Sequence, residues 1–81
     1  MVTLPRKQYH LHFSETERDN VERVLDHLDL IVEVRITSHD TNNEGFYDYF
    51  LGVTNEELLH LKLSCNLIKC YDIEEVQKYF I

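Results

Sequence analysis

The sequence is poor in the residues that build special backbone and covalent features. Its 81 residues include two glycines, one proline, two cysteines and no tryptophan. With only Gly45 and Gly52, the chain has no glycine-rich loop of the kind that holds phosphate groups. Cys65 and Cys70 are too few for a disulfide scaffold, and we interpret both as small buried hydrophobes in a reducing compartment.

Positive charge and long apolar runs are also scarce. Eight Lys and Arg stand against 15 Asp and Glu, which gives a net charge of -7. A charge of this sign disfavours nucleic acid and anionic membranes as partners and favours a protein with a basic surface. No apolar run is long enough to cross a bilayer, and residues 1–7 lack the apolar stretch of a signal peptide. We therefore expect a cytoplasmic protein.

Motifs of catalysis are missing as well. The sequence shows no nucleophile elbow and no cysteine with an evident histidine base. A domain of this size buries a modest core and rarely encloses a pocket by itself. We expect a protein that is not an enzyme and that needs no cofactor.

What the sequence does contain is a repeated helix-start signal. Three times a capping residue precedes a glutamate by three positions, and an apolar helical spacing follows. The three triplets are Ser14-Glu17, Thr54-Glu57 and Asp72-Glu75. They predict a helix after Ser14 to about Leu28, a second from Asn55 to about Ser64, and a short third helix at 73–81.

The segments between these helices alternate in polarity and are predicted to be strands. The side chains expected to face the core are Tyr9, Leu11 and Phe13; Val32, Val34 and Ile36; Tyr47, Tyr49, Leu51 and Val53; and Ile68 and Cys70. The side chains expected on the opposite face are Gln8, His10 and His12; Glu33, Arg35 and Thr37; and Phe46, Asp48 and Phe50.

The resulting order is strand, helix, strand, strand, helix, strand. It predicts an α+β protein with a ferredoxin-like βαββαβ sandwich, in which two helices cover one face of a four-stranded antiparallel sheet. One domain then spans 1–81, with 1–6 as a flexible lead-in. The C-terminal helix at 73–81 is additional to this plan, and it could cover part of the open sheet face.

Two sets of residues on that open face are candidate sites. The first is aromatic: Phe46 and Phe50 would lie exposed and bind a partner, together with Tyr79 and Phe80 of the C-terminal helix. The alternative is that Tyr79 and Phe80 pack onto Phe46 and Phe50 and close a second small core.

The second set is polar. His10 and His12 alternate along the first strand, and Asp48 lies on the neighbouring third strand in the usual order of this fold. Two imidazoles and a carboxylate are suitable ligands for zinc or another transition metal. The alternative is a pair of solvated or hydrogen-bonded histidines.

These observations favour a non-enzymatic interaction or regulatory module. It would use the aromatic patch and its acidic surface to bind a basic protein, and one version is an inhibitor that occupies a basic groove meant for nucleic acid. The predicted order also resembles that of amino-acid-binding, ACT-like regulatory modules. That resemblance implies a homodimer that senses a small effector at its interface.

Overall fold

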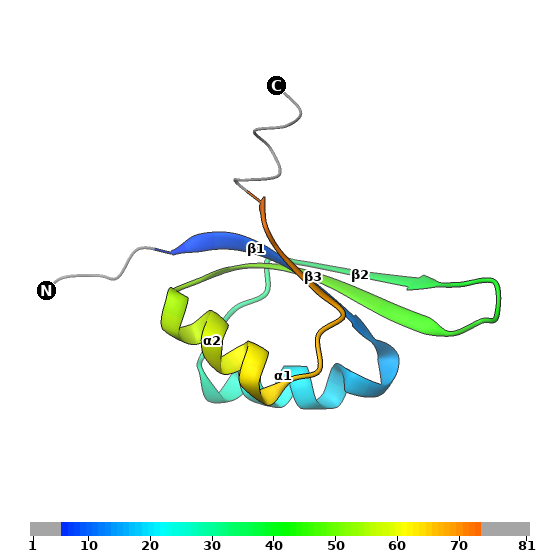
Figure 1. Ribbon diagram of the computed structural model, residues 1–81, viewed down its shortest axis with the longest axis horizontal. Coiled ribbons are helices and arrows are strands. Elements are labelled where there is room, and N and C mark those ends of the chain that lie inside the picture. Colours follow the sequence, from blue (N-terminus) through cyan, green and yellow to red (C-terminus); the bar gives the residue numbers. More distant parts are fainter. Residues whose placement is uncertain (1–5, 74–81) are drawn as a thin grey trace, which may run out of the picture.

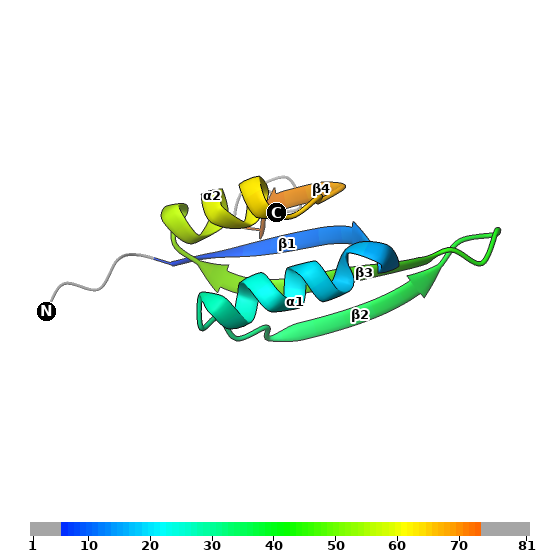
Figure 2. The ribbon, with the colours of Figure 1, turned by 90° about the horizontal axis from the view of Figure 1, so that it is seen from below.

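The chain forms a four-stranded sheet with two helices on one of its faces. The computed structural model describes residues 6–73. The elements are β1 (Lys7–Ser14), a 3-10 turn η1 (Glu15–Glu17), α1 (Arg18–His27), β2 (Val34–His39), β3 (Gly45–Val53), α2 (Asn55–Ser64) and β4 (Lys69–Asp72). All strand pairs are antiparallel, in the order β2-β3-β1-β4, and both helices lie on the same side (Figures 1 and 2). The protein therefore belongs to the α+β class. The expected C-terminal helix, with Tyr79 and Phe80, lies outside the described residues.

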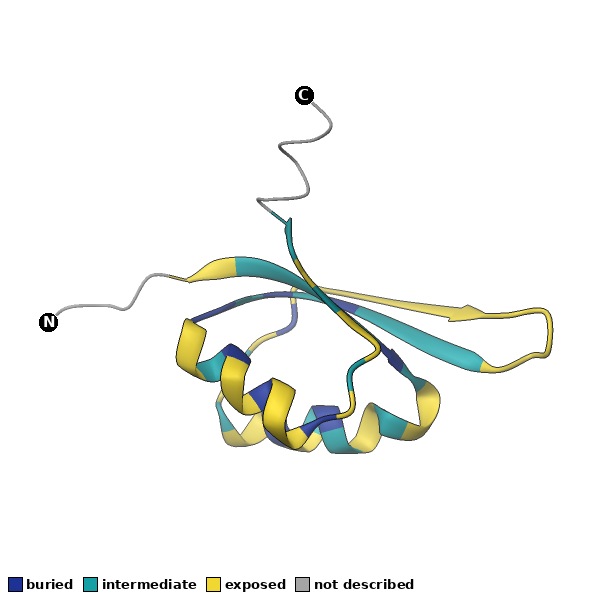
Figure 3. Cartoon of the chain, viewed as in Figure 1, coloured by how far each residue is buried: buried dark blue, intermediate teal, exposed yellow. Residues whose placement is uncertain are grey.

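The core lies between the helices and the sheet (Figure 3). It is built mainly from alternate residues of β1 and β3 and one stripe of each helix, with Val32 and Cys65 from the segments beside them. The strand and helix members are Leu11, Phe13, Tyr49, Leu51 and Val53; Val21, Val24 and Leu25; and Leu58 and Leu61. The predicted alternation of β1 and β3 is confirmed. No helix among the described residues is both long and apolar enough to cross a membrane.

The second capping box is confirmed. The Glu57 N–H donates to Thr54 Oγ1 over 3.2 Å, and the Thr54 N–H donates to Glu57 Oε1 over 2.9 Å. Two backbone donors at the start of α2, which would otherwise have no partner in the helix, are thereby satisfied.

The prediction of a capping box at Ser14 and Glu17 is wrong. Ser14 makes no cap hydrogen bond, and its hydroxyl pairs with that of Thr16 at 2.7 Å. The chain enters α1 through the 3-10 turn, so Glu17 is not in the reciprocal position. The Glu17 carboxylate instead accepts hydrogen bonds from the Asn66 N–H (2.9 Å) and from Asn20 Nδ2 (2.7 Å), which joins the start of α1 to the segment after α2. The third box includes Glu75, outside the described residues.

The predicted alternation of the second strand is also wrong. Val34 and Ile36 pair with Phe50 and Asp48 and lie on the face away from the helices, where they are 48% and 47% exposed. Arg35, expected on that face, turns toward α1. The cause is a bend at Glu33, which separates the buried Val32 from the start of β2 and changes the phase of the alternation.

A second bend, at Ile68, has the same effect before β4. The alternation predicts Ile68 in the core, but this residue is 52% exposed, whereas Cys70 packs against the core as predicted. Cys65 is buried, and both cysteines are free thiols. Burial raises the pKa of each thiol, so both stay protonated and poorly reactive at neutral pH.

Candidate interaction surface

The sheet face away from the helices carries a continuous set of rings and aliphatic side chains. We call it the open face. Strand register places the following side chains on it: Gln8, His10 and His12; Val34 and Ile36; Phe46, Asp48 and Phe50; and Lys69 and Tyr71. Its centre lies on β1 and β3, where His12 is opposite Asp48 and His10 is opposite Phe50.

Asp48 forms the polar centre of this face. His10 Nε2 lies 2.6 Å and His12 Nδ1 lies 2.8 Å from the same oxygen, Asp48 Oδ1. Partial burial acts to raise the pKa of Asp48. The hydrogen bonds and charges of the two histidines lower it by more, so the pKa lies below its ordinary value. Because Asp48 is then ionised at neutral pH and can only accept, each imidazole donates to it the N–H of the ring nitrogen that faces it.

Aromatic rings hold the two histidines in place. The His10 ring stacks on Phe50 with centroids 4.4 Å apart, and the His12 ring stacks on Phe46 at 5.4 Å. Tyr71 contacts His10 from the other side at 5.7 Å. The hydrogen bonds and the stacking act on the same two imidazoles, so the face is organised before any ligand binds.

One end of the open face is hollowed. His10, Phe50, Tyr71 and Ile73 line a depression of about 340 Å³. Its walls are mostly carbon, and its volume falls within the range of small-ligand sites. Such a depression suits an apolar side chain of a partner better than a polar ligand.

The open face carries little formal charge within a strongly acidic protein. Asp48 and Lys69 have opposite formal charges, and the Glu33 carboxylate, which accepts a hydrogen bond from Gln8, adds one negative charge at the margin of the face. Most of the net charge of -7 therefore belongs to the rest of the chain. A neutral aromatic centre surrounded by charged surface is the composition of many protein interfaces.

The structure brings together the three residues expected to bind a metal, but as a hydrogen-bonded group. Tetrahedral zinc sites keep their ligand atoms roughly 3.3 Å apart, since each bond is near 2.0–2.1 Å long. Here His10 and His12 approach the Asp48 oxygen more closely than that. Within residues 6–73, no group of three or more His, Cys, Asp or Glu side chains is arranged to hold a metal ion. The metal site stays a prediction.

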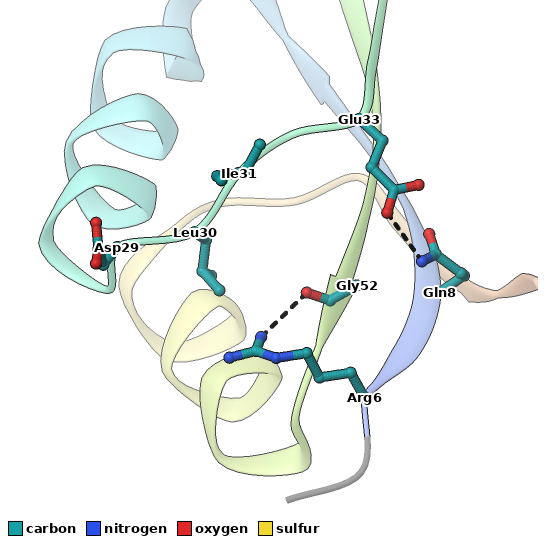
Figure 4. A pocket seen from close by; sticks show the side chains of 7 residues that line it. All are labelled: Arg6, Gln8, Asp29, Leu30, Ile31, Glu33 and Gly52. Atoms are coloured by element: carbon teal, nitrogen blue, oxygen red, sulfur yellow. Dashed lines mark hydrogen bonds between the residues drawn. The ribbon is translucent and has the colours of Figure 1, made fainter. Parts of the chain in front are cut away.

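A second depression lies beside the loop that joins α1 to β2 (Figure 4). Its volume is about 450 Å³, and its lining residues are Arg6, Gln8, Asp29, Leu30, Ile31, Glu33 and Gly52. Arg6 Nη1 donates to the Gly52 carbonyl at 3.3 Å and to Glu57 at 2.7 Å, and Gln8 donates to Glu33 at 3.2 Å. Arg6, Gln8 and Glu33 are thus already engaged in hydrogen bonds, so this depression is the weaker candidate.

Sequence reasoning misses four members of the open face: Val34, Ile36, Lys69 and Tyr71. The alternation of polar and apolar residues places Val34 and Ile36 on the wrong face, because the bend at Glu33 cannot be recognised in that pattern. Tyr71 could have been found, since it follows Cys70 and must face the opposite way.

Neither a protein-family model, nor a curated protein, nor a solved structure matches this chain.

Proposed function

We propose that this protein is a non-enzymatic interaction module that binds a protein partner through the open face. The observation that carries this proposal is the contrast between a sheet face that is rich in rings and carries little formal charge, and an acidic remainder. Exposed aliphatic and aromatic groups on a single face are typical of binding surfaces in small soluble proteins. The preorganised rings would lower the entropic cost of binding.

The chemistry of the face indicates what its partner looks like. An apolar side chain of the partner would enter the depression beside Tyr71, and a lysine or arginine would pair with the ionised Asp48 nearby. Basic residues around this contact would meet the acidic surface outside the open face. If the partner normally holds nucleic acid in a basic groove, the protein would compete with that nucleic acid.

A peptide-display selection tests the proposal and needs no identified partner. The probe is a random-peptide library, selected on the full chain and counter-selected on Phe50→Ala. We expect enriched peptides that combine apolar residues with Lys or Arg and whose affinity falls with rising salt. Leu63→Ala is the matched control, because Leu63 is 79% exposed on α2, away from the open face.

Two results would contradict the proposal. One is a selection in which the wild type and Phe50→Ala enrich the same peptides. The other is a set of peptides whose binding is lost equally in Leu63→Ala. Binding that does not respond to salt would contradict the basic character of the partner and would leave the apolar contact as the basis of binding.

Metal binding remains a second candidate, because His10, His12 and Asp48 lie together on adjacent strands. A small rearrangement of the two imidazoles would be needed to admit an ion. Zinc-dependent stabilisation that is lost in His10→Ala and in His12→Ala would support it. The lack of any thermal shift with zinc, cobalt or nickel would dismiss it.

We also propose the ferredoxin-like βαββαβ architecture for this domain. The strand order β2-β3-β1-β4 and the positions of α1 and α2 after β1 and β3 support this assignment. An experimental structure of the full chain would test it and would place residues 74–81.

A further inference from the structure

β2 forms one edge of the sheet and has β3 as its neighbour. All six of its residues are exposed. The β2–β3 hairpin extends past the end of the helices, and its outer side is uncovered by the described residues (Figures 1 and 2). In an edge strand, the backbone N–H and C=O groups on the outer side are left available for pairing with another strand.

The two edges of the sheet differ in their protection. β4 is only four residues long and begins with a lysine, and both features discourage pairing. β2 has six residues, including the strand-forming Val34, Ile36 and Thr37, and no proline. Its one formally charged residue, Arg35, is turned toward α1 and donates a hydrogen bond to Glu22 at 3.1 Å, so its charge does not prevent pairing at this edge.

We propose that β2 pairs with β2 of a second copy of this chain, antiparallel and about a two-fold axis. Such a contact is self-complementary, because the same strand supplies both sides of it. The two four-stranded sheets would join into one sheet of eight strands. Both pairs of helices would lie on the same side, and the two open faces would become continuous.

The side chains of β2 fit this arrangement. In an antiparallel pair centred on Ile36, this residue would lie opposite its equivalent and Val34 would lie opposite Ser38 of the second copy, which buries apolar surface that is exposed in the single chain. The charge of Arg35 is balanced by Glu22 in the same chain. β2 therefore brings no acidic residue against another, in a protein whose net charge of -7 opposes contact between two copies elsewhere.

The dimer should be weak and should respond to salt. One six-residue strand pair buries less than the roughly 1,200–2,000 Å² of stable interfaces. Two acidic copies repel each other, so higher salt should strengthen this contact, whereas it weakens binding to a basic partner. The inference concerns the edge of the sheet and does not depend on the proposed partner.

Analytical ultracentrifugation of the full chain tests the pairing. The concentration should run from about 10 μM to about 1 mM, the range in which small interfaces associate. Salt should be about 0.05 M in one series and about 0.5 M in the other. We expect a monomer–dimer equilibrium that shifts toward the dimer in high salt. Ile36→Glu should lower the association constant by more than about tenfold, because like charges would meet across the junction.

Leu63→Glu is the matched control and should leave the association constant unchanged. A monomer at every concentration would overturn the proposal. So would a dimer that Ile36→Glu leaves intact but Tyr71→Glu disrupts, since the two copies would then meet face to face. Hydrogen exchange on the wild type supplies a test without substitution: β2 amides should exchange more slowly at high concentration. Unchanged exchange in β2 of a dimeric sample would also overturn the pairing.

Discussion

The two faces of one sheet use the same strands for different purposes. On the helix-covered face, Phe13 and Tyr49 pack edge to face at 4.9 Å, both almost fully buried. On the open face, the rings of Phe46 and Phe50 stack on imidazoles around an ionised carboxylate. The difference teaches that successive residues of β1 and β3 supply the core and the open face in turn, because their side chains alternate across the pleat. We propose recognition as the role of the second set.

Each face also holds one carboxylate between two donors. On the helix side, Tyr49 Oη donates to Glu22 at 2.5 Å and Arg35 Nε donates to it at 3.1 Å. Burial, together with the bond to Glu22, raises the pKa of Tyr49 to about 12, so the phenol remains a donor. Arg35 also lies 5.1 Å above the Tyr49 ring. This network ties β2 and β3 to α1, whereas the Asp48 group ties β1 to β3 alone.

The sharpest way to test the comparison is to remove one ring from each face. Phe13→Ala should lower the free energy of unfolding by about 3–5 kcal/mol, because it empties a buried site. Phe46→Ala should cost about 1 kcal/mol, since its neighbours remain in contact with water. Urea denaturation of both variants measures the difference, and equal losses would mean that the open face is a second core.

The helix-side carboxylate provides the next largest effect. Tyr49→Phe keeps the ring but removes the hydroxyl, and it should destabilise the protein by about 1–2 kcal/mol. Glu22 retains Arg35 as a partner, so the loss should not be larger. Denaturation midpoints at neutral pH are the measurement. A neutral effect would show that water replaces the phenol, and that this network contributes little to the joint between sheet and helix.

The open-face carboxylate should act through pH. A carboxyl whose pKa is lowered on folding stabilises the native state above its unfolded pKa, near 3.9, and this contribution is lost as pH falls through the lower folded value. The free energy of unfolding of the wild type should therefore exceed that of Asp48→Asn by about 1 kcal/mol at pH 5, and this difference should disappear toward pH 3. Paired thermal melts across this range measure it. A gap that widens on acidification would contradict the lowered pKa.

The smallest effect concerns two valines on either side of the bend. Val34→Ala, on the open face, should change the free energy of unfolding by less than about 0.5 kcal/mol. Val32→Ala should cost about 1–2 kcal/mol, because Val32 lies in the core. The two substitutions remove the same atoms two positions apart. Similar losses in the free energy of unfolding would contradict the change in the phase of the alternation at Glu33.

Predictions from the sequence succeeded where the interacting residues are close in the chain and failed where a distant residue takes part. The cap of α2 was predictable because Thr54 and Glu57 lie within one turn and satisfy each other. Glu17 shows the same spacing from Ser14, yet it bonds Asn66, 49 residues away. The pattern is identical in both places. The difference is that a distant backbone donor competes for the first glutamate.

By itself, the sequence determined which segments are helices and strands, and which side of β1 and β3 is buried, because polarity within a few residues decides those properties. Tertiary structure decided the rest. The bend at Glu33 placed the side chains of β2 on the faces opposite to those that the alternation predicts, and the bend at Ile68 took that residue out of the core, since each strand must match the register of its neighbour. The same registers placed His10 and His12 within hydrogen-bond distance of Asp48, and no local pattern specifies a contact between residues 36 and 38 positions apart.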